Sequence, residues 1–426
     1  MYLRKCAGIA LFCGLLAPPL AAQELAWPAP PPPGWDLAAL HRVTDSIVQR
    51  GLDSGAYPGC QVLMACRGQI LLYKAYGYQG IDRLRRVSET DLYDLASLTK
   101  ILGPLPLLMR LHGQGQLDLD APLSRYLPES AGTRAGPLSL RSMLVHEAQL
   151  QAWIPFWQEA LRKDGTWRRR FLRADSSARF PVRIGAQAFV RRGFGQRLLR
   201  RLLRAPRTGV QEYRYSDLGF IVYPHLIARL AGQPYWDLLR DSLYRPIGTG
   251  LTYNPLLQHP LSAVAPSEQD TFFRRGLIHG YVHDENAAIQ GGVSGHAGLF
   301  GHARDVALLM QLFLNGGTLN GRRYLDSASV RLFASYQSQV PLGHRGLGFD
   351  KPVRDPADRN YCADSASAAS FGHSGFTGTF TWADPETGLL IVFLSNRVHP
   401  SRASRQLYRM GIRPALHQAL YALLPR

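Results

Sequence analysis

Lysine, cysteine and long apolar segments are scarce in this chain. Only five of the 49 basic residues are lysines, and 426 residues include just five cysteines. Three cysteines follow residue 22 (Cys60, Cys66 and Cys362), which is too few for a disulfide framework. Cys60 and Cys66 stand about 20 Å apart on an expected strand and cannot bridge, so we expect buried free thiols. Beyond the N-terminus, no segment is long and apolar enough to cross a membrane.

Acidic residues are also few, 31 against 49 basic ones, so the formal charge is +18. The excess is local: residues 162–207 hold 15 Lys and Arg against Asp164 and Asp175, a net of 15 − 2 = +13. A sequence pI of about 10.0 would suit a nucleic-acid ligand in an intracellular protein. With 46% hydrophobic and 19% charged residues, the composition excludes a disordered chain and allows a sizeable core.

The N-terminus predicts export. Arg4 and Lys5 precede an apolar run, Cys6–Leu16, and the small-residue segment Ala17–Ala22. This order is typical of a secretory signal peptide covering residues 1–22, with cleavage after Ala22. A membrane anchor is the alternative, but the run is short and two prolines interrupt its end. We therefore expect a secreted or periplasmic protein, and no nucleic acid as partner.

Strand patterns lie at both ends of the chain and helical patterns in the middle. A Pro-rich linker over residues 23–36 precedes a predicted domain over 37–426. The apolar periodicity predicts helices at Leu37–Gly55, Thr99–Gln114 and Arg402–Leu424. Apolar segments on either side of turn residues predict strands at Cys60–Cys66, Gln69–Tyr76, Phe380–Ala383 and Leu389–Ser395. An antiparallel sheet built from distant segments, with a helical lobe inserted, fits this order.

Three short motifs could carry chemistry. Ser97 and Lys100 are three residues apart and share a face if the segment is helical, so the amine can assist deprotonation of the hydroxyl. Tyr215 and Asp217 follow, and His373-Ser-Gly375 opens an expected strand. A Gly-x-Ser-x-Gly elbow is absent, which counts against an α/β-hydrolase fold.

In this order and spacing, the three motifs resemble those of the serine β-lactamase and penicillin-binding-protein superfamily. The likeness spans about 37–424 and is strongest to the penicillin-binding protein 4B branch and to the lactamase-like half of β-N-acetylglucosaminidase fusions. It implies a mixed α/β (α+β) β-lactamase/DD-peptidase fold, an antiparallel sheet flanked by helices with an inserted all-helical lobe. The α/β lobe would cover about 37–96 and 256–426, and the helical lobe about 97–255.

The resemblance also implies roles for individual residues. Ser97 would attack a carbonyl and become acylated, Lys100 would ease its deprotonation, and Tyr215 would relay protons. The N–H groups of Ser97 and Phe376 would form an oxyanion hole. His373, followed by Ser374 and Gly375, stands where a lysine often anchors a substrate carboxylate, and His283, Asp284 and His296 would hold a loop near the cleft by hydrogen bonds.

Departures from the family pattern bear on the mechanism. Asp217 replaces the usual Asn and, if ionised, would raise the pKa of Lys100, leaving proton transfer to Tyr215. His373 replaces Lys, and a neutral imidazole anchors a carboxylate less well. No Glu-x-x-Leu-Asn element for deacylation is present. Weak β-lactam hydrolysis and stronger esterase or peptidase activity are therefore expected.

A metal site is the alternative reading of His279 and His283, which are four residues apart with His296 farther on. Gly280 disfavours a helix between them, and the order is not His-Glu-x-x-His. We expect no metal and no other cofactor.

The basic segment 162–207 contains an amphipathic pattern, Phe194–Arg204. Its arginines could form a solvated face, attract anionic cell-envelope material, or bind substrate directly.

Together these features predict an exported serine hydrolase acting through an acyl-serine. The substrate would be a small molecule or muropeptide, cleaved by a DD-carboxypeptidase-like or muropeptide-directed peptidase or amidase. A promiscuous carboxylesterase or weak β-lactamase is the alternative within the enzyme class, and a non-catalytic penicillin-binding or cell-wall-sensing module is the alternative outside it. The pattern indicates no oligomeric state.

Overall fold

The computed structural model describes residues 25–425 except 27–32, 211, 356–357 and 359. The predicted signal peptide, residues 1–22, lies outside this range. Part of the predicted linker belongs to the folded domain, because Leu25 is buried in the core and Ala26 pairs with Gln69 at the sheet edge.

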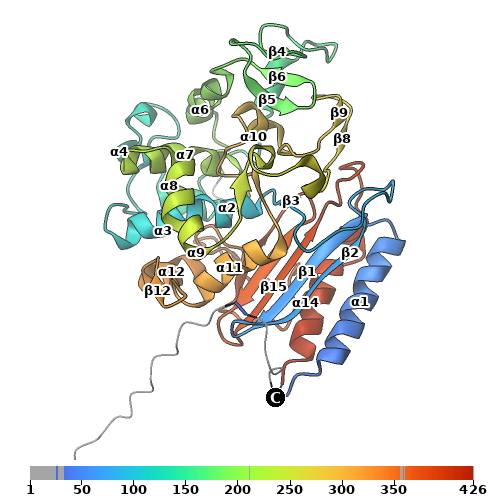
Figure 1. The fold of residues 1–426 in the computed structure, drawn as a ribbon. Helices are drawn as coiled ribbons and strands as arrows, with labels where there is room; N and C mark the ends of the chain where they lie inside the picture. Colours follow the sequence, from blue (N-terminus) through green and yellow to red (C-terminus); the bar gives the residue numbers. More distant parts are fainter. Residues whose placement is uncertain (1–24, 27–32, 211, 356–357, 359, 426) are drawn as a thin grey trace, which may run out of the picture.

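A five-stranded antiparallel sheet forms the centre of the described chain, in the order β13-β14-β15-β1-β2 (Figure 1). Leu63 of β1 stands opposite Val392 of β15, so the first hairpin joins the last one. This confirms the prediction of a sheet built from distant segments. The strands are β1 Gly59–Cys66, β2 Gln69–Gly77, β13 Phe371–Ser374, β14 Phe380–Asp384 and β15 Leu389–Ser395.

Local sequence explains the first hairpin. Arg67 and Gly68 both adopt positive φ, 48° and 77°, as the two central residues of a tight hairpin turn require. Every residue of β1 is buried, because helices cover the sheet on both faces. Cys60, Cys66 and Cys362 are buried free thiols.

Terminal helices pack together on one face of the sheet, and α11 lies on the other (Figure 1). Asp36 caps the first of them by accepting the Ala39 N–H at 2.8 Å. The predicted C-terminal helix is divided in two at Gly411, where φ is 59°. The bounds are α1 Leu37–Asp53, α10 Glu285–Ile289, α11 Ala303–Leu314, α12 Ser327–Ala334, α13 Gln406–Arg409 and α14 Ile412–Ala422.

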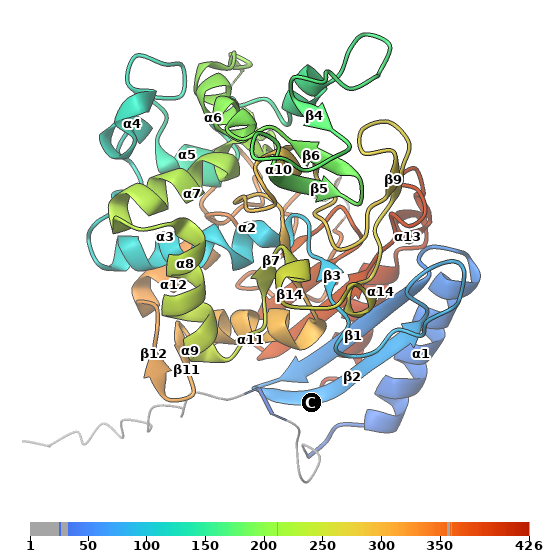
Figure 2. The same ribbon diagram turned by 45° about the horizontal axis from the view of Figure 1, so that its top comes forward.

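The inserted region is mainly helical and stands above the sheet, facing the α11 side (Figures 1 and 2). The helix predicted over Thr99–Gln114 is broken at Gly103, because Pro104 lacks an N–H and disfavours helical geometry in the residue before it. The helices are α2 Leu98–Leu102, α3 Pro104–Gly113, α4 Leu123–Tyr126, α5 Leu140–Leu144, α6 Phe194–Arg204, α7 Leu218–Ala231, α8 Tyr235–Leu239 and α9 Arg245–Ile247.

The expectation that this region is all-helical is wrong. It contains a small antiparallel sheet, β4-β6-β5, visible beside α6 in Figure 2. Its strands are only two to four residues long, and interspersed arginines conceal their alternation of buried and exposed positions. These strands are β4 Leu172–Arg173, β5 Val182–Gly185 and β6 Ala188–Val190.

Short strand pairs complete the fold. One three-stranded sheet, β3-β10-β7, lies directly before the segment that carries Ser97. The remaining strands are β3 Tyr93–Asp94, β7 Thr252–Tyr253, β8 Gln269–Asp270, β9 Gly276–Leu277, β10 Leu299–Gly301, β11 Thr318–Leu319 and β12 Arg322–Arg323.

Helix α6 separates its leucines from its arginines. Leu198, Leu199, Leu202 and Leu203 are buried, and α6 packs against α7 and α10. All its arginines are exposed. The apolar face therefore belongs to the protein core, and only the guanidinium face is presented to solvent. Among the described helices, none combines the length and apolarity that a membrane crossing needs.

Candidate active site

Ser97 lies at the N-cap of α2, and Lys100 follows one turn later on the same face. The fully buried Lys100 Nζ donates to Ser97 Oγ at 2.9 Å. Ala96, just before the serine, has φ of 46°, a conformation rare for a non-glycine residue and here stabilised by its N–H donating to Asp94 Oδ1 at 2.8 Å. The local backbone thus presents Ser97 at a sharp turn between β3 and α2.

Asp217, just before α7, forms an ion pair with Lys100, with 2.6 Å between Oδ1 and Nζ. Burial by itself would lower the pKa of Lys100, but the Asp217 charge and the contacts with Tyr215 outweigh it, so the pKa lies above its ordinary value. Lys100 is therefore an ammonium at neutral pH. It can polarise Ser97 by donating a hydrogen bond, but it holds its own proton firmly.

Tyr215 is placed against the same ammonium, with its ring centre 4.9 Å from Lys100 Nζ. Burial raises the pKa of Tyr215 despite the opposing effect of Lys100, so the phenol stays protonated. A protonated phenol can accept one proton while it donates another, which suits a relay. The His146 ring lies 4.6 Å from the Tyr215 ring and accepts the Ser216 N–H at Nδ1, so it steadies this segment.

The turn after β13 is tied to the segment before Ser97. Thr377 Oγ1 donates to the Asp94 carbonyl at 2.7 Å, and Thr379 Oγ1 donates to the Leu95 carbonyl at 3.0 Å. A Cβ on Gly375 would lie 2.1 Å from Thr379 Oγ1, so only glycine fits this close approach.

The two segments joined here each carry a backbone donor on a residue that lines the pocket. Within the described residues, neither the Ser97 N–H nor the Phe376 N–H has an intramolecular hydrogen-bond acceptor. Such a pair beside a nucleophile can stabilise an oxyanion.

His373 is buried on β13, and its Nδ1 lies 2.8 Å from the Ser374 carbonyl oxygen. A carbonyl only accepts, so Nδ1 carries the proton of the neutral ring and Nε2 is an acceptor. Burial, together with Arg345 and Lys100, holds the pKa of His373 well below its ordinary value. The imidazole is therefore neutral and carries no charge for a substrate carboxylate.

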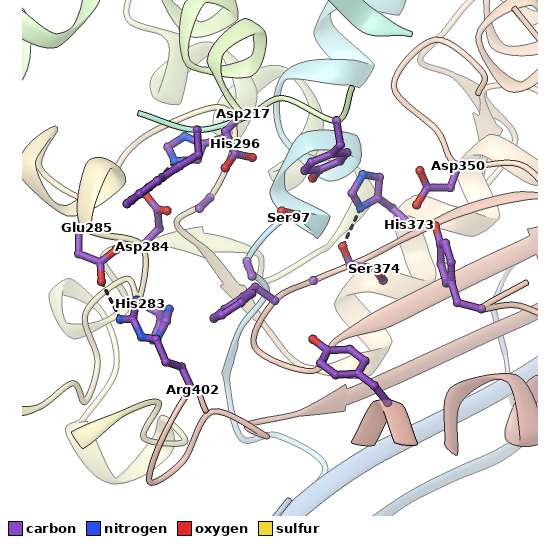
Figure 3. A pocket seen from close by; sticks show the side chains of 18 of the residues that line it. Ser97, Asp217, His283, Asp284, Glu285, His296, Asp350, His373, Ser374 and Arg402 are labelled. Atoms are coloured by element: carbon purple, nitrogen blue, oxygen red, sulfur yellow. Dashed lines mark hydrogen bonds and ion pairs between the residues drawn. The ribbon is translucent and has the colours of Figure 1, made fainter. Parts of the chain in front are cut away.

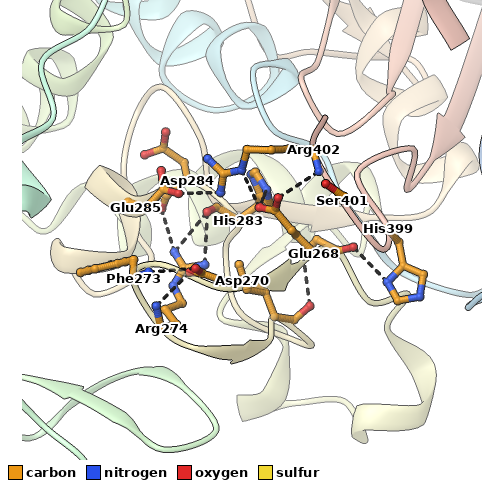
Figure 4. A network of polar contacts seen from close by, with 12 residues as sticks. Glu268, Asp270, Phe273, Arg274, His283, Asp284, Glu285, His399, Ser401 and Arg402 are labelled. Atoms are coloured by element: carbon orange, nitrogen blue, oxygen red, sulfur yellow. Dashed lines mark hydrogen bonds and ion pairs between the residues drawn. The ribbon is translucent and has the colours of Figure 1, made fainter. Parts of the chain in front are cut away.

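A polar network supports the opposite side of the site (Figure 4). The His283 N–H donates to Asp94 Oδ2 at 2.6 Å, which links this loop to the Ser97 segment. Glu268 accepts from His283 Nε2 at 2.9 Å and pairs with Arg402 at 2.6 Å. Arg402 also pairs with Glu285 at 2.6 Å.

His296 acts within the same loop region. Its Nε2 lies 2.8 Å from Asp284 Oδ1, and its Nδ1 lies 2.9 Å from Ser294 Oγ. Its backbone carbonyl accepts from Lys100 Nζ at 3.3 Å. The loop therefore orients both a carboxylate of the pocket wall and the buried lysine.

The motifs enclose one cavity of about 530 Å³ (Figure 3). Lys100 is fully buried and does not line it, whereas the other predicted site residues do: Ser97, Tyr215, Asp217, His283, His296, His373, Ser374, Gly375 and Phe376. Further wall residues that the motifs did not reveal are Trp153, Tyr213, His344, Asp350, Tyr361, Arg402 and Tyr408. These come from segments far apart in sequence, and no local pattern marks them.

Comparison with known proteins identifies the family of the chain that carries this site. The Beta-lactamase family model matches residues 44–412. The chain belongs to the Beta-lactamase family. It is a β-lactamase-fold hydrolase, as the resemblance in the three motifs indicated.

Curated relatives within this family carry cell-wall names. The chain is 29% identical to the "Putative D-alanyl-D-alanine carboxypeptidase" of Escherichia coli (strain K12), with 93% of this chain and 92% of that protein covered. It is 28% identical to the "N-acetylmuramyl-L-alanine amidase" of Bacillus subtilis (strain 168), covering 84% and 81%. Among solved structures, "EstCE1, a hydrolase with promiscuous acyltransferase activity" superposes with a TM-score of 0.65 at 21% identity, covering 89% of this chain and 99% of that one.

Proposed function

We propose that this protein is an exported serine hydrolase that forms an acyl-Ser97 intermediate on muropeptide-type acyl donors, as a peptidase or amidase. The observation that carries the proposal is the contact of Ser97 Oγ with the Lys100 ammonium, next to two backbone N–H groups that have no acceptor within the described chain. The names of the curated relatives support a cell-wall acyl donor.

The reaction follows from the positions of these groups. The Ser97 oxygen forms a bond to the substrate carbonyl carbon as its proton passes to the Tyr215 hydroxyl oxygen, which at the same time donates its own proton to the leaving nitrogen or oxygen. The negative charge on the carbonyl oxygen is stabilised by the N–H groups of Ser97 and Phe376. The bond between the carbonyl carbon and the protonated leaving group then breaks, which leaves the acyl group on Ser97. Water repeats the sequence in reverse and releases the acid.

An esterase is the second candidate, and the neutral imidazole of His373 favours it. An ester needs no carboxylate anchor, and its leaving group departs more readily than an amine. A non-catalytic binding module is disfavoured, because such a module has no need of the Ser97, Lys100 and Tyr215 arrangement.

Two probes test the proposal. Fluorophosphonate and fluorescent penicillin should each label the protein, with the adduct mapped by mass spectrometry to Ser97. A D-alanine release assay on a muropeptide pentapeptide then separates peptidase from esterase activity. Absence of an adduct on Ser97 with both probes would overturn the mechanism, and labelling by fluorophosphonate alone would favour the esterase.

We further propose that the α6 face associates with an anionic lipid surface of the cell envelope. Among the described residues, Arg201 is the one α6 arginine with a carboxylate partner, Glu159. A groove beside α6 is lined by Arg197, Arg200, Arg201 and Arg204. The buried leucines exclude insertion of this helix, so the association would be electrostatic and sensitive to salt.

A further inference from the structure

The two cations in closest contact with the site residues, Lys100 and Arg402, are already balanced by carboxylates. Lys100 pairs with Asp217, as described above. Arg402, the one lysine or arginine that lines the pocket in the described chain, pairs with both Glu268 and Glu285. A substrate carboxylate that approached Arg402 would meet these two acidic groups as well.

The end of the pocket near Asp350 and His373 also has no unbalanced cation on its described wall. Asp350 lines it (Figure 3) and contacts the fully buried Arg345, which does not line it, and burial raises the pKa of Asp350 to about 8. His373 stands beside it, with Nδ1–H committed to the Ser374 carbonyl and a buried Nε2 that has no partner among the described residues. The Nε2 lone pair can only accept a hydrogen bond. A carboxylate oxygen at this position also only accepts, so the two lone pairs would repel each other.

Two more arginines lie near the pocket but not on its wall. The guanidinium of Arg397 is 4.6 Å from the centre of the Phe376 ring, and that of Arg413 is 5.9 Å from the Tyr361 ring. Both rings line the cavity, whereas neither arginine does. Aromatic surface therefore covers these two cations on the pocket side.

Carboxylates themselves contribute to the wall. Asp217 and Asp284 retain 19% and 22% exposure of their side chains, and both face the cavity on the same side of Ser97 (Figure 3). Among the described residues, the Asp284 carboxylate has one ion-pair partner, the histidine His296. The described wall of the pocket therefore has more carboxylates than cations, and its one cation is balanced.

We propose that the pocket selects acyl donors whose leaving side is neutral or cationic, and discriminates against a free carboxylate next to the scissile bond. The inference rests on the proposed function and narrows it, since it favours cleavage of amides, esters or internal peptide bonds over release of a C-terminal amino acid. Hydrogen-bond donors on the leaving group would be recognised by His373 Nε2.

A matched substrate pair tests this selectivity. An N-acyl-D-Ala-D-Ala peptide and its C-terminal amide differ only in the carboxylate. We expect kcat/KM to be at least about tenfold higher for the amide. On Ser97→Ala, calorimetry should show tighter binding of the amide, a measurement that does not depend on turnover. Equal or tighter binding of the free acid would overturn the inference.

Variants of His373 test whether this residue causes the selectivity against a carboxylate. His373→Lys should raise the acid-to-amide ratio of kcat/KM by at least about tenfold, whereas Gln187→Lys, an exposed site in the β5–β6 turn, should leave the ratio unchanged. A melting temperature of His373→Lys close to that of the wild type shows that the variant is folded. An unaltered ratio in a folded His373→Lys protein would refute the assignment.

Different results would overturn the proposed function and the proposed selectivity. If neither peptide is cleaved and no probe labels Ser97, the proposed function is wrong, while the affinities on Ser97→Ala still decide the selectivity. If both peptides are cleaved with the free acid preferred, the hydrolase stands and the selectivity is wrong. In that case Arg397→Gln would show whether the covered arginine supplies the anchor.

Discussion

Replacement of Asp217 by Asn tests the state of Lys100 most directly. The substitution keeps the side-chain volume but removes a negative charge 2.6 Å from a fully buried ammonium. Breaking a buried ion pair by removing one partner costs about 3–5 kcal/mol. Because the Asp217 side chain is 19% exposed, solvent screens part of the interaction, and we use the lower value of about 3 kcal/mol for the free-energy cost. At about 1.4 kcal/mol per factor of ten, the ammonium is disfavoured about 100-fold.

The pH profile of kcat/KM for a chromogenic ester gives the readout. Asp217 raises the pKa of Lys100, so removing Asp217 lowers that pKa. If the ammonium is the active form, the alkaline limb of the profile should move about two pH units toward neutrality. Asp237→Asn, which disrupts an exposed pair with Arg240, is the matched control and should leave the profile unchanged.

The opposite outcome would refute the assignment. If neutral Lys100 were the general base, the wild type would gain activity with rising pH, and Asp217→Asn would move that acid limb downward and raise the rate at pH 7. An unchanged profile would also contradict the argument, since it would mean that the ion pair does not govern the titration. Thermal melts at each pH separate these effects from unfolding.

Three further predictions concern the nucleophile, the oxyanion hole and the basic face. Ser97→Ala should abolish fluorophosphonate labelling without lowering the melting temperature, and residual labelling would place the nucleophile elsewhere. Gly375→Ala should reduce kcat by about 10²–10³ with little change in KM, because the added methyl group would displace an oxyanion donor; unaltered kcat would exclude this donor. Arg200→Gln combined with Arg204→Gln should weaken binding to phosphatidylglycerol vesicles by about 10–30-fold at low salt, at about 1 kcal/mol per charge, whereas Arg322→Gln should not. Undiminished vesicle binding, or binding to peptidoglycan alone, would contradict the lipid proposal.

Local patterns predicted much of the fold. The hairpin at Arg67–Gly68 follows from turn chemistry, and the apolar runs on either side of the turn identify the strands. The motif order indicated which segments meet, and the structure places them around one cavity. The prediction failed at Gly103–Pro104, where two local signals conflict. The apolar periodicity continues across this site, but the backbone chemistry of proline interrupts the helix.

The small sheet of the inserted region illustrates a different limit. Strands of two to four residues carry too few positions for a period to be recognised, and they are stabilised mainly by burial against neighbouring elements. Ile184, Ala188 and Val190 are buried there, but in the sequence they are scattered among arginines.

By itself, the sequence determined that the Ser97 and Lys100 side chains meet, since their spacing on one helical turn needs only local geometry. It also specified the separation of leucines and arginines on α6. Only the tertiary structure decided the electrostatics of the pocket. Arg402 reaches Glu268 across 134 residues, and His373 is neutral because it is buried beside Arg345 and Lys100. Charge balance and desolvation depend on distances between segments that are remote in the chain, and no local pattern encodes those distances.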